Sequence, residues 1–425
     1  MNIRFRKQEQ ERGSILVVTI FIGTAIAVAL GSYLLLVRTQ NVSVVRSQAW
    51  SAALAMAEAG AEEALAQLNP GAIATTISVN RSANGWGAPS GGVYGPVSRS
   101  LTNASYSVVF TDATFPIIYS TGYVTLPDLS ATLARVVRIA TTNVPLYNVG
   151  LAARSGISMN GNGVSVDSFD SSNPALSTNG RYDPAKTSTN GTVALVSGSL
   201  SVGNHSISGN LMLGPTATYA GSPNSVSGTI SSDLNVDFPQ VALPPDVGSW
   251  STLALPLPGI VNGVLYNYVF NAPGGDYIIP SLSGNVYIAS NATVRLDVQS
   301  GGSSGVQVAG TGSKAGKLTV YIASPSFSVG GNGAVDGGNP ANLSYYGLPS
   351  NTSISFSGNA LFTGTLYAPS ADLTLNGGGN NTYDFVGSCV AKSVTMNGHF
   401  MFHFDQNLLN AGASRGYLAT YWQEL

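Results

Sequence analysis

The sequence predicts an α+β protein with a long N-terminal membrane-spanning helix, a small antiparallel sheet and a large all-β domain. Three observations support this order. Residues 14–37 carry no charge, residues 104–141 contain three strand-like runs, and the remainder is punctuated by Gly and Asn. For the large domain we expect a β-solenoid of the right-handed β-helix type, with a β-sandwich as the alternative.

The composition of the 425-residue chain is poor in charge, with 9% Asp, Glu, Lys and Arg against about 25% in an average soluble protein. The 50 glycines show no collagen-like period, and frequent β-formers favour a turn-dense β structure. A net charge of −2 gives no reason to expect nucleic acid as a partner. The single Cys389 excludes an intrachain disulfide, and we expect a buried, inert thiol.

Residues 14–37 are long enough to cross a membrane as a helix. At about 1.5 Å per residue, this run covers a hydrocarbon core of roughly 30 Å. The leader, residues 1–13, is basic and favours a cytoplasmic N-terminus with an exported body. A secretory signal peptide is the competing interpretation. Ala25-Ile26-Ala27 resembles a small-x-small cleavage site, but the apolar run continues beyond it.

The helix is expected to continue outside the membrane and to cover residues 14–69, because Asn69-Pro70-Gly71 is a strong stop signal. Such a helix would be on the order of 80 Å long. Its outer half carries a narrow apolar seam, formed by Val42, Val45, Ala49, Ala52, Met56 and Ala59. We interpret the seam as an assembly surface for neighbouring helices. A lone anchor with an amphipathic stalk is the alternative.

The N-terminal features together resemble the class III signal of type IV pilins and type II secretion pseudopilins. They are a short basic leader, Arg12-Gly13 before the small residue Ser14, an apolar span and an amphipathic helix. This resemblance implies cleavage by a prepilin peptidase between Gly13 and Ser14, with methylation of the new N-terminus. The stretch "SAALAMAEAGAEEALAQLN" is similar to the helix of PilX-type minor pilins, which often carry an "AEAG" step.

One position departs from the pattern of major pilins. Most of them have Glu at the fifth mature residue, whereas this sequence has Val18. In the family, that Glu is understood to neutralise the N-terminal amine of a neighbouring subunit inside the fibre, where an unpaired charge is costly. Its absence favours a tip, initiating or otherwise minor subunit over a major one.

Residues 70–144 are expected to form a small antiparallel β meander. The runs "ASYSVVF", "FPIIYSTGYVTL" and "ATLARVVRIATT" are separated by turn residues, and Tyr106, Val108 and Phe110 alternate onto one face. A helix followed by such a meander matches the order of elements in pilins, and the strands could pack on the outer half of the helix.

Residues 145–410 show an irregular repeat of short apolar pieces with Gly and Asn corners. "APSADLTLNG" aligns with "AKSVTMNG", and Gly358, Gly377 and Gly398 lie 19 and 21 residues apart. A unit of about 20 residues is expected of a solenoid rung, although residues 215–282 interrupt it. The C-terminal tail, residues 411–425, contains Tyr421 and Trp422, and we expect it to cap an open solenoid end.

Residues 145–425 also resemble an exported domain family of undefined function that follows PilX-type N-termini. The resemblance rests on "VDSFDSS", "GTLYAPSADLTLNGGG", "MFHFDQNL" and the terminal "YWQEL". It implies no activity.

Candidate chemistry is sparse. His399, His403 and Asp405 could form a metal site, but a spacing of four in a strand separates two ligands by about 13 Å. Asp167 and Asp170 could bind calcium, although the same phrase suits turn hydrogen bonds. Catalytic motifs are absent and the acidic residues are scattered, so we expect no enzyme and no cofactor.

The sequence therefore predicts a minor type IV pilin or pseudopilin-like subunit for pilus assembly or surface contact. Its expected partners are prepilin peptidase, other pilin or pseudopilin subunits, the inner membrane and a surface glycan. The body would be periplasmic or extracellular, and assembly would carry it to a pilus or the cell surface. The alternatives are a membrane-anchored β-solenoid adhesin that does not polymerise and, less favoured, a carbohydrate-active enzyme.

Overall fold

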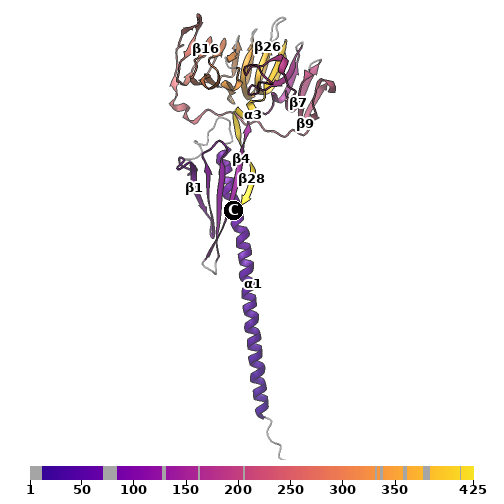
Figure 1. Ribbon diagram of the computed structural model, residues 1–425, viewed down its shortest axis with the longest axis vertical. Coiled ribbons are helices and arrows are strands. Elements are labelled where there is room, and N and C mark those ends of the chain that lie inside the picture. The colour runs from indigo at the N-terminus through magenta and orange to yellow at the C-terminus, as the bar shows by residue number, and fades with distance from the viewer. Residues whose placement is uncertain are drawn as a thin grey trace, which may run out of the picture. The chain divides into compact units, whose positions relative to one another are not determined.

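The computed structural model describes residues 12–69, 84–126, 131–160, 163–203, 206–330, 333–335, 338–357, 361–376, 383–411 and 413–425. Residues 1–11 of the predicted leader and the Pro70-Gly71 stop lie outside this set. The chain divides into two compact units. The helix–sheet unit contains residues up to 65, 85–141 and 419–425, and the β body contains residues 66–84 and 142–418. The predicted long apolar helix and large, mostly β body are confirmed (Figure 1).

Helix α1 (Arg12–Leu68) is a single helix of 57 residues, corresponding to roughly 85 Å. Its first half is apolar and contains many β-branched residues of moderate helix propensity, and its second half is rich in Ala, the best helix former. Within the described residues, this is the one helix that is long and apolar enough to cross a membrane. The side chains of its apolar half are exposed, including Phe21 (74%) and Val28 (70%).

The sheet of the helix–sheet unit has five strands in the order β1-β2-β3-β4-β28. Their bounds are β1 (Val93–Ser100), β2 (Ala104–Thr111), β3 (Ile117–Leu126), β4 (Ala131–Pro145) and β28 (Ser414–Glu424). The first four strands form an antiparallel meander. Val108 and Phe110 are fully buried and Tyr106 is half-buried, which matches the predicted alternation on β2.

The C-terminal tail lies elsewhere than predicted. Instead of capping the β body, β28 forms the edge of the five-stranded sheet beside β4. The amide of Leu425 donates to the carbonyl of Val136, and Thr420 Oγ1 donates to the carbonyl of Ala140. Tyr421 and Trp422 are 53% and 45% exposed. Pairing with β4 bonds the backbone groups on one side of this edge strand, and the side chains of Tyr421 and Trp422 are exposed to solvent.

The β body contains short strands and single-turn helices. Its strands are β5 (Leu151–Met159), β6 (Ser165–Phe169), β7 (Val193–Gly203), β8 (Ser206–Ile207), β9 (Leu211–Gly221), β10 (Ile230–Ser231), β11 (Ser251–Thr252), β12 (Gly259–Val261), β13 (Val264–Tyr266), β14 (Tyr268–Phe270), β15 (Gly274–Ile279), β16 (Asn285–Ile288), β17 (Thr293–Val298), β18 (Gly302–Ser303), β19 (Gly305–Val308), β20 (Lys317–Ile322), β21 (Ser326–Gly330), β22 (Gly333–Val335), β23 (Leu343–Gly347), β24 (Ser353–Ser357), β25 (Phe362–Asn376), β26 (Tyr383–Asn397) and β27 (Phe400–Asp405). The helices are η1 (Pro184–Lys186), η2 (Pro223–Ser225), η3 (Pro245–Ser249), η4 (Gly312–Lys314), η5 (Pro340–Asn342) and α3 (Leu408–Ala411).

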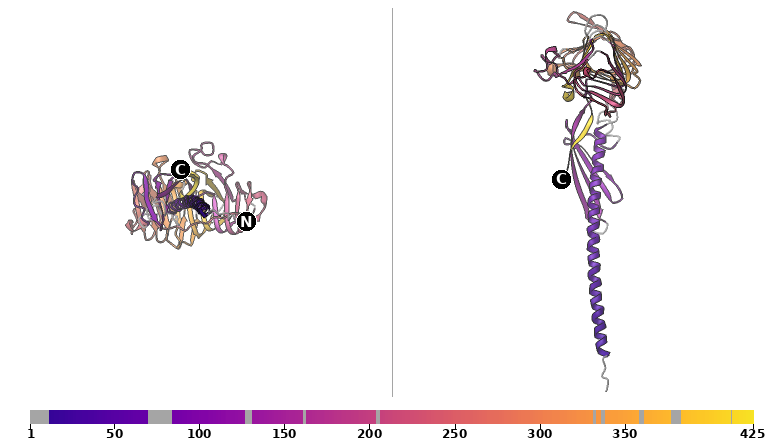
Figure 2. Two further views of the ribbon diagram at one scale, coloured as in Figure 1. Left: turned by 90° about the horizontal axis from the view of Figure 1, so that it is seen from below. Right: turned by 90° about the vertical axis from the view of Figure 1, so that its right-hand side faces the viewer.

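Most strands of the β body pair in parallel, and the stacking order differs from the chain order. From one end, the ladder runs β15-β17-β20-β23-β25-β26. It then continues from β26 to β5, the first strand of the body, and on to β7 and β9. Figure 1 shows β16, β26, β7 and β9 in this order across the body, and the right view of Figure 2 looks along the stack. The chain therefore enters the stack at its middle.

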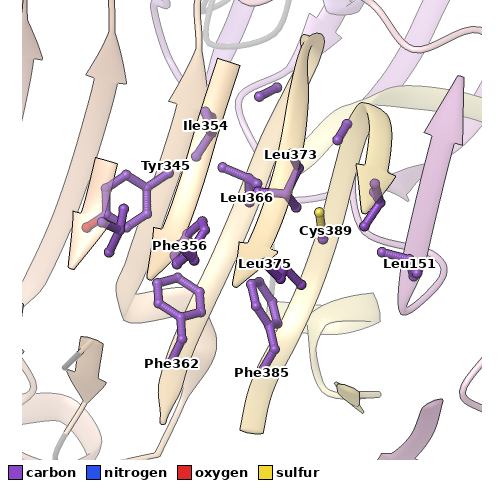
Figure 3. Packing of buried hydrophobic residues seen from close by; sticks show 14 of the residues in the cluster. Leu151, Tyr345, Ile354, Phe356, Phe362, Leu366, Leu373, Leu375, Phe385 and Cys389 are labelled. Atoms are coloured by element: carbon purple, nitrogen blue, oxygen red, sulfur yellow. The ribbon is translucent and has the colours of Figure 1, made fainter. Parts of the chain in front are cut away.

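The core of the β body lies inside the stack. Alternate residues of each strand point inward, so equivalent positions on successive strands build ladders of apolar side chains. Aromatic rings form one such ladder, visible in Figure 3: Phe362 and Phe385 lie 4.6 Å apart between centroids. Phe385 stacks in turn on Phe402 at 4.5 Å. Cys389 is fully buried beside this ladder, and burial raises the pKa of its thiol.

A salt-bridge cluster fastens the segment around η3 to the ladder. Arg295 on β17 donates to both carboxylate oxygens of Asp276 (2.7 and 2.6 Å), its register partner on β15. It also donates to Asp246 of η3 (2.6 Å), and its guanidinium lies 4.7 Å from the ring centroid of Trp250. The hydrogen bond from Arg295 lowers the pKa of Asp246.

Replacing Arg295 with lysine is expected to open this segment locally. Lysine keeps the charge but loses the planar fork and the stacking on Trp250, and because Asp246 is half exposed the cost is about 1 kcal/mol. Hydrogen–deuterium exchange at residues 244–252 should speed up. Arg154→Lys is the control, because Arg154 donates a single long hydrogen bond, 3.4 Å to the Pro369 carbonyl. Exchange at residues 244–252 should stay unchanged in this variant. Equal exchange in both variants would contradict the bracing role.

Candidate functional site

Helix α1 is the candidate functional element because it combines an uncovered apolar half with a docked half. Residues 15–36 expose nearly all of their apolar side chains. An exposed apolar surface of this length is unfavourable in water and is stabilised when lipid or other helices cover it. Further along the helix, Ala53, Ala57, Ala61 and Ala64 are buried within the helix–sheet unit. Small side chains on this face allow the helix backbone to approach the sheet closely.

Two glycines bring the helix and the sheet into contact. A Cβ atom at Gly60 of α1 would overlap Ser120 Oγ and lie 2.8 Å from Cδ2 of Tyr106. On the opposing surface, a Cβ at Gly122 of β3 would overlap the Ala53 carbonyl oxygen and lie 2.5 Å from the Ala57 nitrogen. Gly60 belongs to the "AEAG" step, so this sequence signal marks the site of closest approach.

Glu63 of α1 binds the sheet through its carboxylate. It accepts hydrogen bonds from Tyr106 (2.5 Å to Oε2) and from Arg99 Nη2 (2.8 Å to Oε1). Trp86, which is 1% exposed, donates from Nε1 at 3.3 Å. Partial burial by itself raises the pKa of Glu63, but the hydrogen bonds from Arg99 and Tyr106 outweigh it and the net shift is downward. Burial, together with the bond to Glu63, raises the pKa of Tyr106 to about 12.

A second polar cluster joins the helix, the sheet and the C-terminal strand. Arg135 on β4 forms a salt bridge with Glu424 of β28. The same guanidinium lies 4.7 Å from the ring centroid of Trp50 and donates to the Trp50 carbonyl at 3.3 Å. Neither Glu63 nor Arg135 stood out in the sequence, because their partners are remote along the chain. The one local hint is the position of Glu63 beside the face of α1 that is formed by buried alanines such as Ala61 and Ala64.

The predicted assembly seam is divided between buried and exposed positions. Ala49 and Met56 are buried within this chain, so their side chains are not available to another subunit. Val42, Val45 and Ala59 are half-buried, and Ala52 is exposed. At Ala49 and Met56 the three-four spacing thus describes a face that is buried within this chain, and such a face has the same periodicity as a helix–helix contact.

The predicted processing residues lie in the first turn of α1. For Gly13 and Ser14 only the backbone is described, and it is helical. Val18, at the position where major pilins carry Glu, is 51% exposed in the apolar half of the helix.

The residues considered for metal binding are engaged in other ways. His403 on β27 is 1% exposed, and its Nδ1 lies 2.5 Å from Asp167 Oδ1 on β6. Tyr182 donates to the other oxygen of Asp167 at 2.9 Å and stacks on His403. His399 lies in the bend before β27. No group of three potential metal ligands occurs among the described residues.

Of the two residues considered as calcium ligands, Asp167 pairs with His403 and Tyr182, and Asp170 serves in a turn. Asp170 Oδ1 accepts hydrogen bonds from the amide (2.9 Å) and hydroxyl (2.6 Å) of Ser172, as the turn interpretation predicts. Asp405 is fully buried and accepts from the amides of Ser171 (2.9 Å) and Asn407 (3.1 Å). Its burial raises its pKa.

Comparison with known proteins identifies one family match and three structural similarities. Residues 278–411 match a domain of unknown function, DUF7305. No curated protein matches the chain. The competence-associated pilin ComZ of Thermus thermophilus is similar over 88% of this chain and 97% of its own, with 11% identity and a TM-score of 0.29.

The other two similar structures are ice-binding proteins, each covering 62% of this chain. One is a glycosylated protein from an Arctic yeast, with 94% of its own chain covered, 14% identity and a TM-score of 0.24. The other is a DUF3494 domain from Shewanella frigidimarina, with 100% covered, 12% identity and a TM-score of 0.26. TM-scores this low do not establish a shared fold.

Proposed function

We propose that this protein is a minor type IV pilin or pseudopilin-like subunit of the PilX type, which inserts into the inner membrane and assembles through its N-terminal helix. One observation supports this most strongly. The outer half of α1 is docked on an antiparallel meander through glycine contacts, while the apolar residues 15–36 are uncovered. A helix of this length exceeds what a simple anchor needs, and its free apolar half provides a surface for neighbouring helices.

In this proposal, the leader is removed by prepilin peptidase between Gly13 and Ser14. Val18 favours a minor position, since a tip subunit needs no carboxylate to pair with the amine of a neighbour. The β body, which we interpret as a β-solenoid, is non-enzymatic and is exposed on the fibre or cell surface. The parallel ladder from β15 to β9 supports the solenoid interpretation.

The proposal is tested by intact-mass and N-terminal analysis of the protein isolated from its native envelope. We expect a chain that begins at Ser14 and carries one added methyl group. The variant Gly13→Ala should keep its leader, because the peptidase of this family requires glycine before the cleaved bond. Gly23→Ala is the matched control, since a Cβ there meets no atom within 4 Å, and it should be processed normally.

The alternative outcomes separate the competing functions. A mature chain that retains its leader would indicate a permanently anchored surface protein. A start beyond Ala27 would indicate a signal peptide. Either result would contradict the pilin-type proposal.

A further inference from the structure

The β body contains a polar pocket of about 510 Å³, formed by four loop segments that are distant in sequence. The lining residues are Ser171, Asn179, Gly180, Arg181, Thr311, Gly312, Asn339, Asn342 and Asn407. This volume falls within the range of small-molecule sites. The lining side chains that the structure describes are amides, hydroxyls and one guanidinium, without an aliphatic, aromatic or acidic group. Such a lining offers several hydrogen-bonding groups to a hydrophilic ligand.

A buried amide in the pocket wall indicates a binding function. Asn342, in η5 before β23, is 7% exposed and lines the pocket. Neither its amide nitrogen nor its oxygen has a hydrogen-bond partner among the described residues. The neighbouring Asn339 uses its side chain to cap η5, by accepting from the Ala341 amide at 3.0 Å. The Asn342 amide atoms are not among the fully buried polar atoms that lack a partner, so they are open to the pocket. A ligand there can both donate hydrogen bonds to this amide and accept them from it.

A tight turn presents a second amide at the pocket. Asn179 and Gly180 occupy the centre of a two-residue turn, with φ of 53° and 75°. Paired backbone hydrogen bonds between Thr178 and Arg181, both 3.0 Å, close the turn. Such an Asn-Gly turn is conformationally well defined. It therefore fixes the backbone from which the exposed Asn179 side chain projects at the pocket.

The remaining walls add hydroxyl and amide groups. Thr311 precedes η4 without capping it through its side chain, so its hydroxyl stays available to a ligand. Asn407 donates to Ser171 Oγ at 3.1 Å, which positions both side chains in the wall. The backbone amides of these two residues are already bound to the carboxylate of Asp405.

We propose that this pocket binds a neutral saccharide unit. Each amide offers both a donor and an acceptor, and a sugar hydroxyl can satisfy both because it donates and accepts. A carboxylate or phosphate oxygen without a proton only accepts hydrogen bonds, so such a group placed against Asn342 would not pair with its amide oxygen. An anion would also come close to Asp405, whose buried carboxyl group accepts hydrogen bonds from the backbone amides of the lining residues Ser171 and Asn407. The proposal does not depend on assembly into a fibre, so either proposal can fail without the other.

The test uses the full-length chain in a detergent without a sugar headgroup. Its binding to an array of neutral mono- to tetrasaccharides is compared with binding to galacturonate and inorganic phosphate. We expect at least one neutral saccharide to bind. Asn179→Gly preserves the left-handed turn while removing the amide, and should weaken that binding about tenfold, as expected for one lost hydrogen bond. Asn342→Ala should weaken it at least as much.

Asn262→Gly is the matched control, because Asn262 also has a positive φ of 49° and lies outside the pocket lining. This variant should bind the saccharide with unchanged affinity. The exposed position Thr311 provides a blocking variant, Thr311→Trp, which should abolish binding without altering the buried core. Failure of every neutral saccharide to bind, preferential binding of galacturonate or phosphate, or unchanged affinity in Asn179→Gly would overturn the proposal.

Discussion

Replacing Gly122 with valine is expected to separate helix α1 from its sheet and to destabilise the helix–sheet unit by about 3 kcal/mol or more. The first added carbon would overlap the Ala53 carbonyl oxygen and lie 2.5 Å from the Ala57 nitrogen. Both obstacles belong to the helix backbone, so a rotamer change cannot relieve the overlap. Hydrogen–deuterium exchange of β2 and β3 in the detergent-solubilised chain should accelerate strongly.

The neighbouring residue provides the control for Gly122. Thr121 points to the opposite face of β3, so Thr121→Val adds no atom towards the helix and should change stability by less than about 0.5 kcal/mol. Gly60→Ala should be milder than Gly122→Val, because its obstacles are the side chains of Ser120 and Tyr106. Unperturbed exchange in Gly122→Val would show that the helix does not approach the sheet this closely.

Replacing Glu63 with alanine is expected to destabilise the helix–sheet unit by about 2–3 kcal/mol. The change removes charge-assisted hydrogen bonds from Arg99 and Tyr106 and leaves the Trp86 indole N–H without its acceptor. Thermal unfolding of the detergent-solubilised chain measures the loss. The adjacent Glu62 is exposed, so Glu62→Ala should be nearly neutral. A loss of equal size in both variants would contradict the anchoring role of Glu63, because alanine is the better helix former and propensity alone predicts no loss.

The contribution of Glu63 should also depend on pH. Its pKa in the folded protein lies below the ordinary value of 4.5, so the carboxylate binds protons less readily in the folded state than in the unfolded state. The resulting stability is present above pH 4.5 and is lost as the pH falls through the lower, folded-state pKa. The stability difference between wild type and Glu63→Ala should therefore shrink in acid. A constant difference would contradict this linkage.

Local sequence patterns predicted helix α1 and strands β2, β3 and β4 of the helix–sheet unit, but not strands β1 and β28. The uncharged run and the Ala-rich segment determine a long helix by composition alone, and the alternation in β2 and β3 determines strands. The seam was harder to interpret, because a three-four spacing is the same whether the partner is another helix or the protein's own sheet. Burial of Ala49 and Met56 decides between these partners for two of its positions.

In the β body, the sequence predicted a period of about 20 residues with Gly and Asn corners, but not the order of the stack. Two of the glycines that define this period, Gly358 and Gly377, lie outside the described residues. A repeat of about 20 residues predicts that consecutive turns of the chain lie side by side. Pairing of β26 with β5 joins segments more than 200 residues apart, and no local pattern encodes such a contact. The polar pocket has the same origin, since its walls come from four separate loops.

The sequence by itself determined the apolar helix, the candidate cleavage site at Gly13 and the β-rich, charge-poor body, because each follows from local composition and spacing. Only the tertiary structure decided that β28 completes the sheet, that Glu63 anchors the helix and that Asn342 faces a pocket. These features depend on which distant groups meet, and the free energy of such contacts comes from packing and desolvation that a linear pattern does not record.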